Sequence, residues 1–584
     1  MEGQEGWRTV AGAVLVIAQT AFCETTYCRS MDRVASLDPA QAASIYAGRA
    51  VLLSYETLLE YDYRERPYRL IPGLAEALPS VSSNGLVYLF RIHPQARFRP
   101  DACFGAGAGG RPQGRPVTAA DVVYSLKRLG DRKVASPGAW LVEDTVVGMR
   151  AFSERSAQAG PTDYGAEVAG LRATDPQTVR IELARPMHVF PYLMTTPYSA
   201  VVPREAVAFY GSGFGSHEVG TGPYRLSAWR RNHQMSYERD PAWRGWQQGP
   251  AALGDGALAP FDRVEYRLID DVSTQWLCFL AGELDFLGEV TRDNWDVVIG
   301  QSGELSEDLR AKGISLFSMP TLEVAYIGIN MDDPVLGPNR ALRQALNSAF
   351  DGAAWERFYN GRVVRCDGPV PPGTAGRQSG EFAFAFNLER ARQLMREAGY
   401  PDGVDPKTGR RLELTLDLGR TSQDMRETTE LIVSFWDRLG IALKPQFHNW
   451  PAFLKRVSSR QSQMFRLGWT ADYPDAENFM KLFYSKNASP GPNRANYANP
   501  AFDRLYEEAC AAPDEGTRNA CWDRAQTLVK EDCPWVFLHF QKAYSLCHER
   551  VQNYTPSDFP NGSEKYLRVK ITGPGAAPET GGRR

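Results

Sequence analysis

Residues 464–479 read MFRLGWTADYPDAENF, a strand pattern followed by an acidic loop. Side chains alternate between the two faces of a strand, so Met464, Arg466 and Gly468 share one face and Trp469 lies on the other. Helix and strand patterns alternate on both sides of this stretch, and this alternation decides the fold class.

Those patterns have clear local signals. PVTAADVVYSLKRL (116–129) has Thr118 as an N-cap and Asp121 three residues later, so a helix begins there. LVYLFRI (86–92) is rich in β-branched and aromatic residues, as strands are. Other strands are expected at 178–186, 224–241 with a hairpin-like break, 261–269, 324–330, 412–419, 442–450 and 535–546, and other helices at 45–60, 272–286 with a short strand at its end, 339–351, 388–400 and 421–441. The class is therefore mixed α/β.

Composition excludes several classes of protein. The chain has 584 residues, of which 43% are hydrophobic and 23% charged, so most of it is neither disordered nor collagen-like. At about 150 residues per domain, the length predicts roughly four domain-sized units. The formal net charge is −3, which argues against a nucleic-acid partner because such proteins carry a basic excess or stripe.

Nine cysteines are too few for a disulfide scaffold of this length, and no CxxC pair is present. Cys510 and Cys521 flank an expected helix–loop–helix and could meet across it. Whether they form a bridge is open, since spacing alone does not fix the distance between two Cα atoms.

The N-terminus favours export. Val10–Cys23 reads VAGAVLVIAQTAFC, which is too short to span about 30 Å of hydrocarbon but fits the apolar region of a signal peptide. Residues 1–23 are therefore expected to be a signal peptide or a membrane anchor, with lipidation of Cys23 left open. A buried first helix or strand is the alternative, because Glu2 and Glu5 precede the run where positive charge is expected. The tail from Gly573 is low in complexity and is expected to be disordered.

Motifs for catalysis and cofactors are few. Gly105, Gly107 and Gly110 have the GxGxxG spacing, but an arginine–proline loop follows, so no helix N-terminus is expected there for a pyrophosphate. The sequence has no P-loop, HExxH or GxSxG, and its seven histidines are scattered. We therefore expect no metal and no cofactor. Carboxylates are numerous, so a hydrolytic carboxylate pair stays open.

Eight stretches, in order, resemble the family 5 extracellular solute-binding proteins, the peptide and oligopeptide receptors of ABC importers. The resemblance covers roughly residues 30–570, and eight motifs in sequence are specific where one would be weak. The stretches are SLDPAQA (36–42), YETLLEYD with LIPGLAEAL (55–78), PVTAADVVYSLKRL (116–129), GTGPYRLSAWRRNHQMSYERDPAWRG (220–245), STQWLCFLAGELDF (273–286), YIGINMDDPVLGPNRALRQALNSAFD (326–351), GWTADYPDAENF (468–479) and YANPAFDRLYEEA (497–509).

The resemblance implies a two-lobed fold of the periplasmic-binding-protein type, type II, enlarged by an inserted domain. One lobe of such a protein is discontinuous in sequence. The implied domains are lobe I at 24–54, 170–312 and 538–584, the inserted domain II at 55–169, and lobe III at 313–537.

The resemblance also implies a ligand site. Each end of an enclosed peptide loses water and needs an opposite charge. Asp472 of the TADY motif is expected to receive the ligand amino group, and Tyr473 of the same motif to contact the ligand. Arg466 falls where some relatives bind the ligand carboxylate. Trp469 is expected to wall the ligand, and Gly468 to let its backbone approach closely.

Alternatives remain for these residues. Asp472 could cap the following turn, Arg466 could form a structural ion pair, and Trp469 could belong to the core. Some relatives carry an aromatic residue after a Ser-Pro pair. Here Ser136-Pro137 is followed by Gly138, so Trp140 is the candidate to replace that contact with the ligand. Asp475 and Glu477 are expected to be solvated loop charges.

The implied function is not enzymatic. We expect a periplasmic or otherwise extracytoplasmic receptor, monomeric, that captures a short peptide between its lobes and delivers it to the permease subunits of an ABC importer. No catalytic residue is expected in this hypothesis. The alternative is a carboxylate-dependent hydrolase that acts on peptides or glycans.

Overall fold

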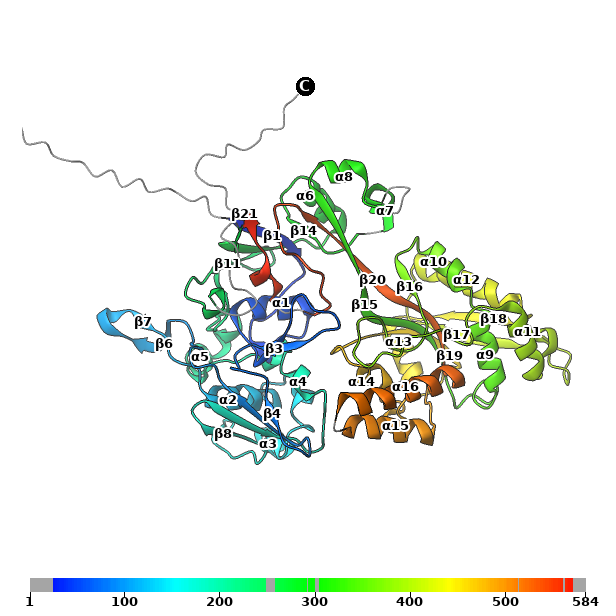
Figure 1. Ribbon diagram of the computed structural model, residues 1–584, viewed down its shortest axis with the longest axis horizontal. Helices are drawn as coiled ribbons and strands as arrows, with labels where there is room; N and C mark the ends of the chain where they lie inside the picture. Colours follow the sequence, from blue (N-terminus) through cyan, green and yellow to red (C-terminus); the bar gives the residue numbers. More distant parts are fainter. Residues whose placement is uncertain are drawn as a thin grey trace, which may run out of the picture.

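The computed structural model describes residues 25–247, 258–290, 292–299, 304–512, 514–559 and 562–570. The N-terminal segment 1–23 and the tail from Gly573 lie outside these residues. The centre of the described structure is one mixed sheet that runs through the whole molecule (Figure 1). In spatial order the strands are β10 (Tyr224–Arg230), β11 (Gln234–Arg239), β13 (Arg263–Leu268), β1 (Thr26–Met31), β14 (Phe286–Leu287), β20 (Trp535–His548), β15 (Ile314–Ile329), β19 (Met464–Thr470), β17 (Glu413–Leu418) and β18 (Ala442–Phe447), with β16 (Val363–Arg365) also paired to β20.

Two long strands, β15 and β20, join the two ends of this sheet. They pair antiparallel from Ile314 opposite His548 to Pro320 opposite Lys542, and again from Val324 opposite Phe540 onward. Between these two runs the register shifts, so the ladder is irregular at residues 320–324. Figure 1 shows both strands passing from the upper region beside β14 into the part that holds α9–α16. The expected strand at 324–330 is therefore the second half of a longer strand.

Most of the remaining small elements belong to the first lobe, which holds β1, β10, β11 and β13, or to a smaller sheet beside it. A four-stranded sheet, β4-β5-β9-β8, packs against α2, whose Thr118–Asp121 capping box confirms the predicted helix start. Its strands are β4 (Ser80–Val81), β5 (Val87–Arg91), β8 (Leu171–Asp175) and β9 (Thr178–Glu182). The other elements are α1 (Ile45–Ser54), α2 (Ala119–Gly130), α3 (Met149–Ser156), α4 (Phe190–Leu193), α5 (Arg204–Tyr210), α6 (Val272–Leu280), α7 (Arg292–Val298), α8 (Glu307–Ala311), β2 (Leu59–Tyr61), β3 (Leu70–Pro72), β12 (Leu258–Ala259) and β21 (Val569–Lys570).

Helices cover both faces of the sheet in the second lobe, which holds β17, β18 and β19. One apolar core lies under the group α9–α12, and another lies on the opposite face with α13–α16. These helices are α9 (Arg340–Ser348), α10 (Gly352–Phe358), α11 (Leu388–Glu397), α12 (Gln423–Asp437), α13 (Trp450–Ser458), α14 (Glu477–Met480), α15 (Pro500–Ala511) and α16 (Glu515–Asp532). A sheet covered on both faces accounts for the apolar runs in its strands.

Two further expectations have clear outcomes. The GxGxxG segment forms the hairpin of β6 (Asp101–Ala106) and β7 (Pro112–Gln113), with no helix directly after it, as predicted. The bridge between Cys510 and Cys521 is not formed, and both are free thiols. Each sulfur instead packs separately into the apolar core of α15 and α16.

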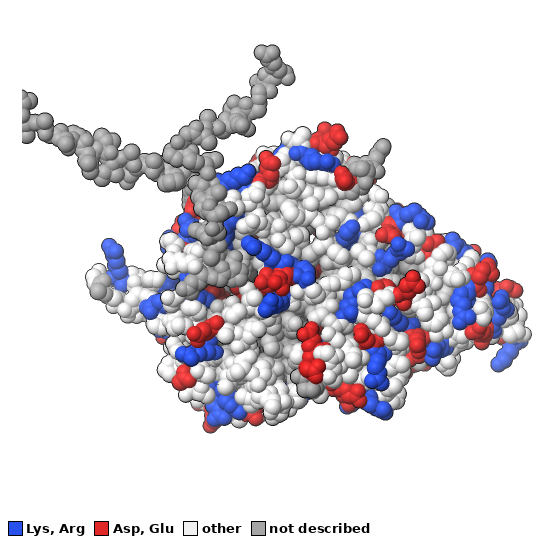
Figure 2. Space-filling model, in the orientation of Figure 1, with Lys and Arg blue, Asp and Glu red and all other residues white. Residues whose placement is uncertain are grey.

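The surface carries both signs of charge. Figure 2 shows basic and acidic side chains interspersed over the visible face, rather than gathered into a field of one sign. Among the described residues, no helix is long and apolar enough to cross a membrane.

Candidate functional site

Strand β19 carries three of the six residues predicted to bind a ligand, namely Arg466, Gly468 and Trp469. Met464 packs into the core under α9–α12, whereas Phe465 packs into the core of α13–α16, so the predicted alternation of faces is confirmed. Gly468 and Thr470, near the end of the strand, are exposed. A Cβ at position 468 would lie 3.3 Å from the carbonyl oxygen of Val324. The end of β19 is therefore accessible backbone.

Arg466 lies on the α12 side of β19 and is half-buried. Its Nη1 donates to Thr428 Oγ1 at 2.6 Å and lies 3.3 Å from Met425 Sδ, while Nη2 donates to Tyr359 Oη at 3.3 Å. The guanidinium carbon is 5.4 Å from the ring centre of Trp355. All of these partners are uncharged, so they orient the guanidinium without neutralising it.

A neutral histidine adjoins this arginine. His539 is buried, and its Nδ1 accepts a hydrogen bond from Trp355 Nε1 at 3.0 Å. Burial, with the positive charge of Arg466 as a second cause, lowers the pKa of His539 to about 3. Asp424 adds some negative charge to the same region, since it helps to raise the pKa of Tyr359, which burial raises most. Arg466 thus lies beside a neutral histidine, and its hydrogen-bond partners Thr428 and Tyr359 are uncharged.

Asp472 lies just after β19, with 46% of its side chain exposed. Its Oδ2 accepts from Lys481 Nζ at 3.2 Å and from Asn478 Nδ2 at 3.2 Å. Asn478 Oδ1 in turn accepts from Trp469 Nε1 at 2.8 Å and from the Asp472 amide at 3.3 Å. Asn478 therefore joins Trp469 and Asp472 into one polar unit. The sequence did not mark it, because an asparagine in a polar loop carries no distinguishing pattern.

Across from Asp472 lies the segment around Tyr198, in a short helical turn at Pro197–Ser199. Burial raises the pKa of Tyr198, and the charge of Asp472 adds to this, so the two side chains lie within electrostatic range of one another. A Cβ at Gly138 would lie 2.6–2.8 Å from atoms of the Tyr198 side chain. An aromatic side chain at position 138, such as some relatives carry after Ser-Pro, would therefore clash with Tyr198. Trp140, two residues after Gly138, is 48% exposed.

The acidic loop after Asp472 is not solvated, which corrects the expectation for two residues. Asp475 is 1% exposed and forms a two-bonded ion pair with Arg518. The Glu477 carboxylate accepts from the hydroxyls of Tyr473 and Tyr506. Tyr473 is 6% exposed and packs with the core of the four-stranded sheet β4-β5-β9-β8. A contact of Tyr473 with ligand stays a prediction.

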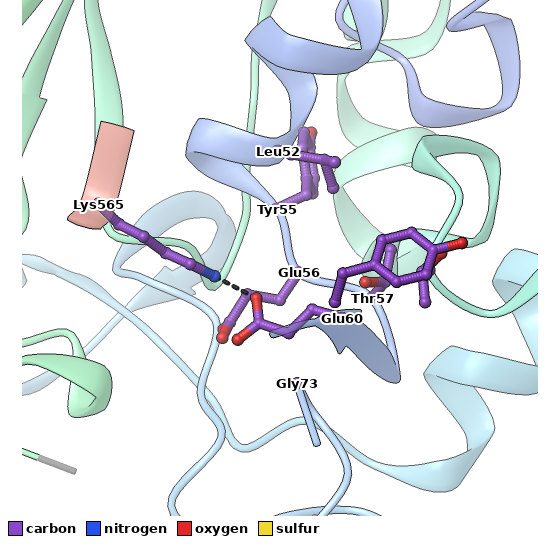
Figure 3. Close-up of a pocket in the computed structure, with 9 residues that line it drawn as sticks. Leu52, Tyr55, Glu56, Thr57, Glu60, Gly73 and Lys565 are labelled. Atoms are coloured by element: carbon purple, nitrogen blue, oxygen red, sulfur yellow. Dashed lines mark hydrogen bonds and ion pairs between the residues drawn. The ribbon is translucent and has the colours of Figure 1, made fainter. Parts of the chain in front are cut away.

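A separate small cavity lies where α1, β2 and the C-terminal segment meet (Figure 3). Glu56 receives two hydrogen bonds of 2.8 Å from Arg244, and Glu60 receives one from Lys565 and one of 3.3 Å from Tyr566. Figure 3 shows Glu60 and Lys565 pointing toward one another at its wall. Each pair joins two opposite charges, and the two pairs hold three segments together. Its lining residues are Leu52, Tyr55, Glu56, Thr57, Glu60, Tyr61, Gly73, Thr195 and Lys565.

Residues 69–491 match the model of the bacterial extracellular solute-binding proteins, family 5 middle. The chain is 23% identical over 526 residues to heme-binding protein A of Haemophilus influenzae, covering 89% of this chain and 87% of that one. It is 25% identical over 560 residues to the periplasmic oligopeptide-binding protein OppA of Salmonella typhimurium, covering 92% and 91%. The structure of HbpA2 from Haemophilus parasuis superposes with a TM-score of 0.78 at 22% identity, covering 94% of this chain and all of that one.

Proposed function

Because the chain belongs to the bacterial extracellular solute-binding proteins, family 5, we propose that it is a receptor for short peptides. The peptide is held between the two lobes outside the cytoplasm and passed to the permease subunits of an ABC importer. The receptor works as a monomer and leaves its ligand chemically unchanged. Attachment through the N-terminal segment is a further part of this proposal.

The observation that carries the peptide class is the environment of Arg466. A half-buried guanidinium that donates to uncharged groups retains the capacity to bind a carboxylate with two bonds. Asp472 is the predicted anchor for the other end of the ligand. The two positions are six residues apart in sequence, so at about 3.3 Å per residue they are at most roughly 20 Å apart. That span suits an extended peptide of about six residues or fewer.

The exposed backbone of β19 between these anchors supports the same class. Gly468 presents no side chain, so a ligand main chain can approach the strand and exchange hydrogen bonds with it. Trp469 lies beside it as an apolar wall, fixed by Asn478.

Closure is assigned to the irregular segment of the β15–β20 pair. The ladder loses its register between Pro320 and Val324, and these are the two strands that connect the lobes. A few element-terminal or irregular residues that absorb backbone rotation are the usual form of a hinge.

The hydrolase alternative has less support. The carboxylates near β19 already have cationic or hydroxyl partners: Asp472 pairs with Lys481, Asp475 with Arg518, and Glu477 with two tyrosines. A hydrolytic pair needs one carboxyl group that holds a proton beside another that stays ionised. The relatives named above are binding proteins.

Calorimetry with an alanine series from two to five residues, each as free acid and as C-terminal amide, tests the proposal. We expect Arg466→Gln to weaken binding of the free acids by about tenfold to a hundredfold, the loss of a charge-assisted hydrogen bond. Binding of the amides should change little. Arg392→Gln, at an exposed position of α11, is the matched control. Equal binding of acids and amides by the unmodified protein would contradict the role of Arg466, and absence of peptide binding would overturn the peptide class.

Native mass spectrometry of freshly purified protein provides an independent measurement. A retained peptide that is recovered intact after long incubation supports a receptor. Cleavage of that peptide supports the hydrolase instead.

A further inference from the structure

The position expected for a ligand ammonium is already filled by a side chain of this protein. Lys481 Nζ lies 3.2 Å from Asp472 Oδ2, 5.2 Å from the ring centre of Trp469 and 5.3 Å from that of Tyr473. A carboxylate with aromatic faces around it is the usual chemistry for recognising an ammonium group. Here the recognised ammonium belongs to Lys481.

The position of Lys481 is well fixed. It follows α14 directly, and its carbonyl accepts from Asn487 Nδ2 at 2.9 Å. Its side chain is only 19% exposed, in contrast to the 72% of Lys486 nearby. Asn478, one turn earlier, holds the same Asp472 oxygen. The Asp472–Lys481 pair is therefore a built part of the site rather than a flexible surface contact.

This pairing changes what the anchor can bind. With Lys481 in place, Asp472 offers no net negative charge, and a ligand ammonium would approach a second ammonium of the same sign. Both contacts use Oδ2, which leaves Oδ1 as the acceptor for an uncharged N–H group.

We propose that Lys481 is a specificity-determining residue that makes the receptor prefer peptides whose amino end is uncharged. Such an end is acylated or otherwise blocked. This inference rests on the proposed peptide function and names the ligand class within it. Together with the cation at Arg466, it predicts a ligand of net negative charge.

The test compares each alanine peptide with its N-acetylated form by calorimetry at one ionic strength. We expect the unmodified protein to bind the acetylated form at least as tightly as the free form. Lys481→Met should shift the ratio of the two dissociation constants by about tenfold toward the free peptide, since Asp472 then becomes an unpaired anion. Lys481→Arg keeps the charge and should keep the preference. Lys486→Met, which removes an exposed lysine, is the matched control.

The possible results separate the two proposals. If both peptide forms bind but the ratio is the same in Lys481→Met, the inference is overturned while the receptor function stands. A preference of the unmodified protein for the free form by tenfold or more also overturns it. If neither form binds to the unmodified protein, the peptide function itself fails. Circular dichroism and thermal unfolding of each variant establish that it is folded.

Discussion

Asp475 and Arg518 form an ion pair with both bonds in place, 2.5 and 2.7 Å long, and their side chains are 1% and 3% exposed. The aspartate follows β19 and the arginine lies on α16. Burial raises the pKa of Tyr192 on α4 to about 12; the charge of Asp475 adds to this rise and that of Arg518 opposes it. The pair thus fixes the loop that carries Asp472 against the helices behind it.

Replacement of one partner of this pair should be strongly destabilising. In Asp475→Asn the buried guanidinium loses its counter-charge, and breaking a buried pair in this way costs about 3–5 kcal/mol. Urea unfolding measures the free energy of unfolding. Glu507→Gln, which breaks the exposed pair with Lys486, should leave it unchanged. Equal stability of Asp475→Asn and the unmodified protein would contradict a structural role for the pair.

His539 should make stability fall as the pH falls. Its pKa is about 3 in the folded protein, below the unperturbed value of about 6.5, because burial and then Arg466 disfavour the charged form. Between these values the unfolded chain binds the proton and the folded protein does not, so stability is present above pH 6.5 and is lost toward pH 3 at about 1.4 kcal/mol per unit.

The variant that checks this is His539→Asn, whose carbonyl can still accept from Trp355. We expect a flatter profile of unfolding free energy between pH 4 and 6.5 than in the unmodified protein. Exposed His233→Asn is the control and should keep the original slope. An identical slope in His539→Asn would mean that other groups cause the pH dependence.

Asp558 should stabilise the irregular segment between the lobes. It accepts from the Leu322 amide at 3.0 Å and from Tyr68 Oη at 2.8 Å. Asp558→Ala leaves both donors without this acceptor, which costs about 1–3 kcal/mol for a buried group. Asp558→Asn retains an acceptor for Leu322 and should cost less, as measured by thermal unfolding. Equal losses in the two variants would argue against this hydrogen bond as the cause.

The thiols of Cys28 and Cys547 should react slowly in the native protein and fully after denaturation. Burial raises the pKa of Cys28 and Cys547 to about 12, so little thiolate is present near pH 8.

Because Cys510 and Cys521 are free, alkylation of the denatured protein should modify both without prior reduction. Mass spectrometry reads the number of labels, and a label at either position that depends on reductant would indicate a disulfide.

Local patterns in the sequence predicted local structure well. The capping box at Thr118 predicted the start of α2, because a cap and its partner lie three residues apart and need no distant contact. The first half of β15 was missed. Pro320 interrupts its pattern, and only pairing with β20, far along the chain, makes residues 314–320 a strand.

The site shows the same division. The sequence indicated the alternation of β19 and the charges at Arg466 and Asp472. It did not predict that Asp475 is buried, because its partner Arg518 lies 43 residues away. The pairing of Asp472 with Lys481 was missed for a related reason, since an acid followed by a lysine nine residues later is common on surfaces. Partners brought together by the fold leave no periodic signal.

The place of β20 in the sheet has a consequence for biogenesis. This strand is central in space, between β14 and β15, yet it begins only at Trp535. While a ribosome is still making the preceding residues, both halves of the sheet have an unfilled edge at the same place. Assembly of the two halves must therefore wait for one late segment, and a nascent chain stalled before it would expose open strand edges of both.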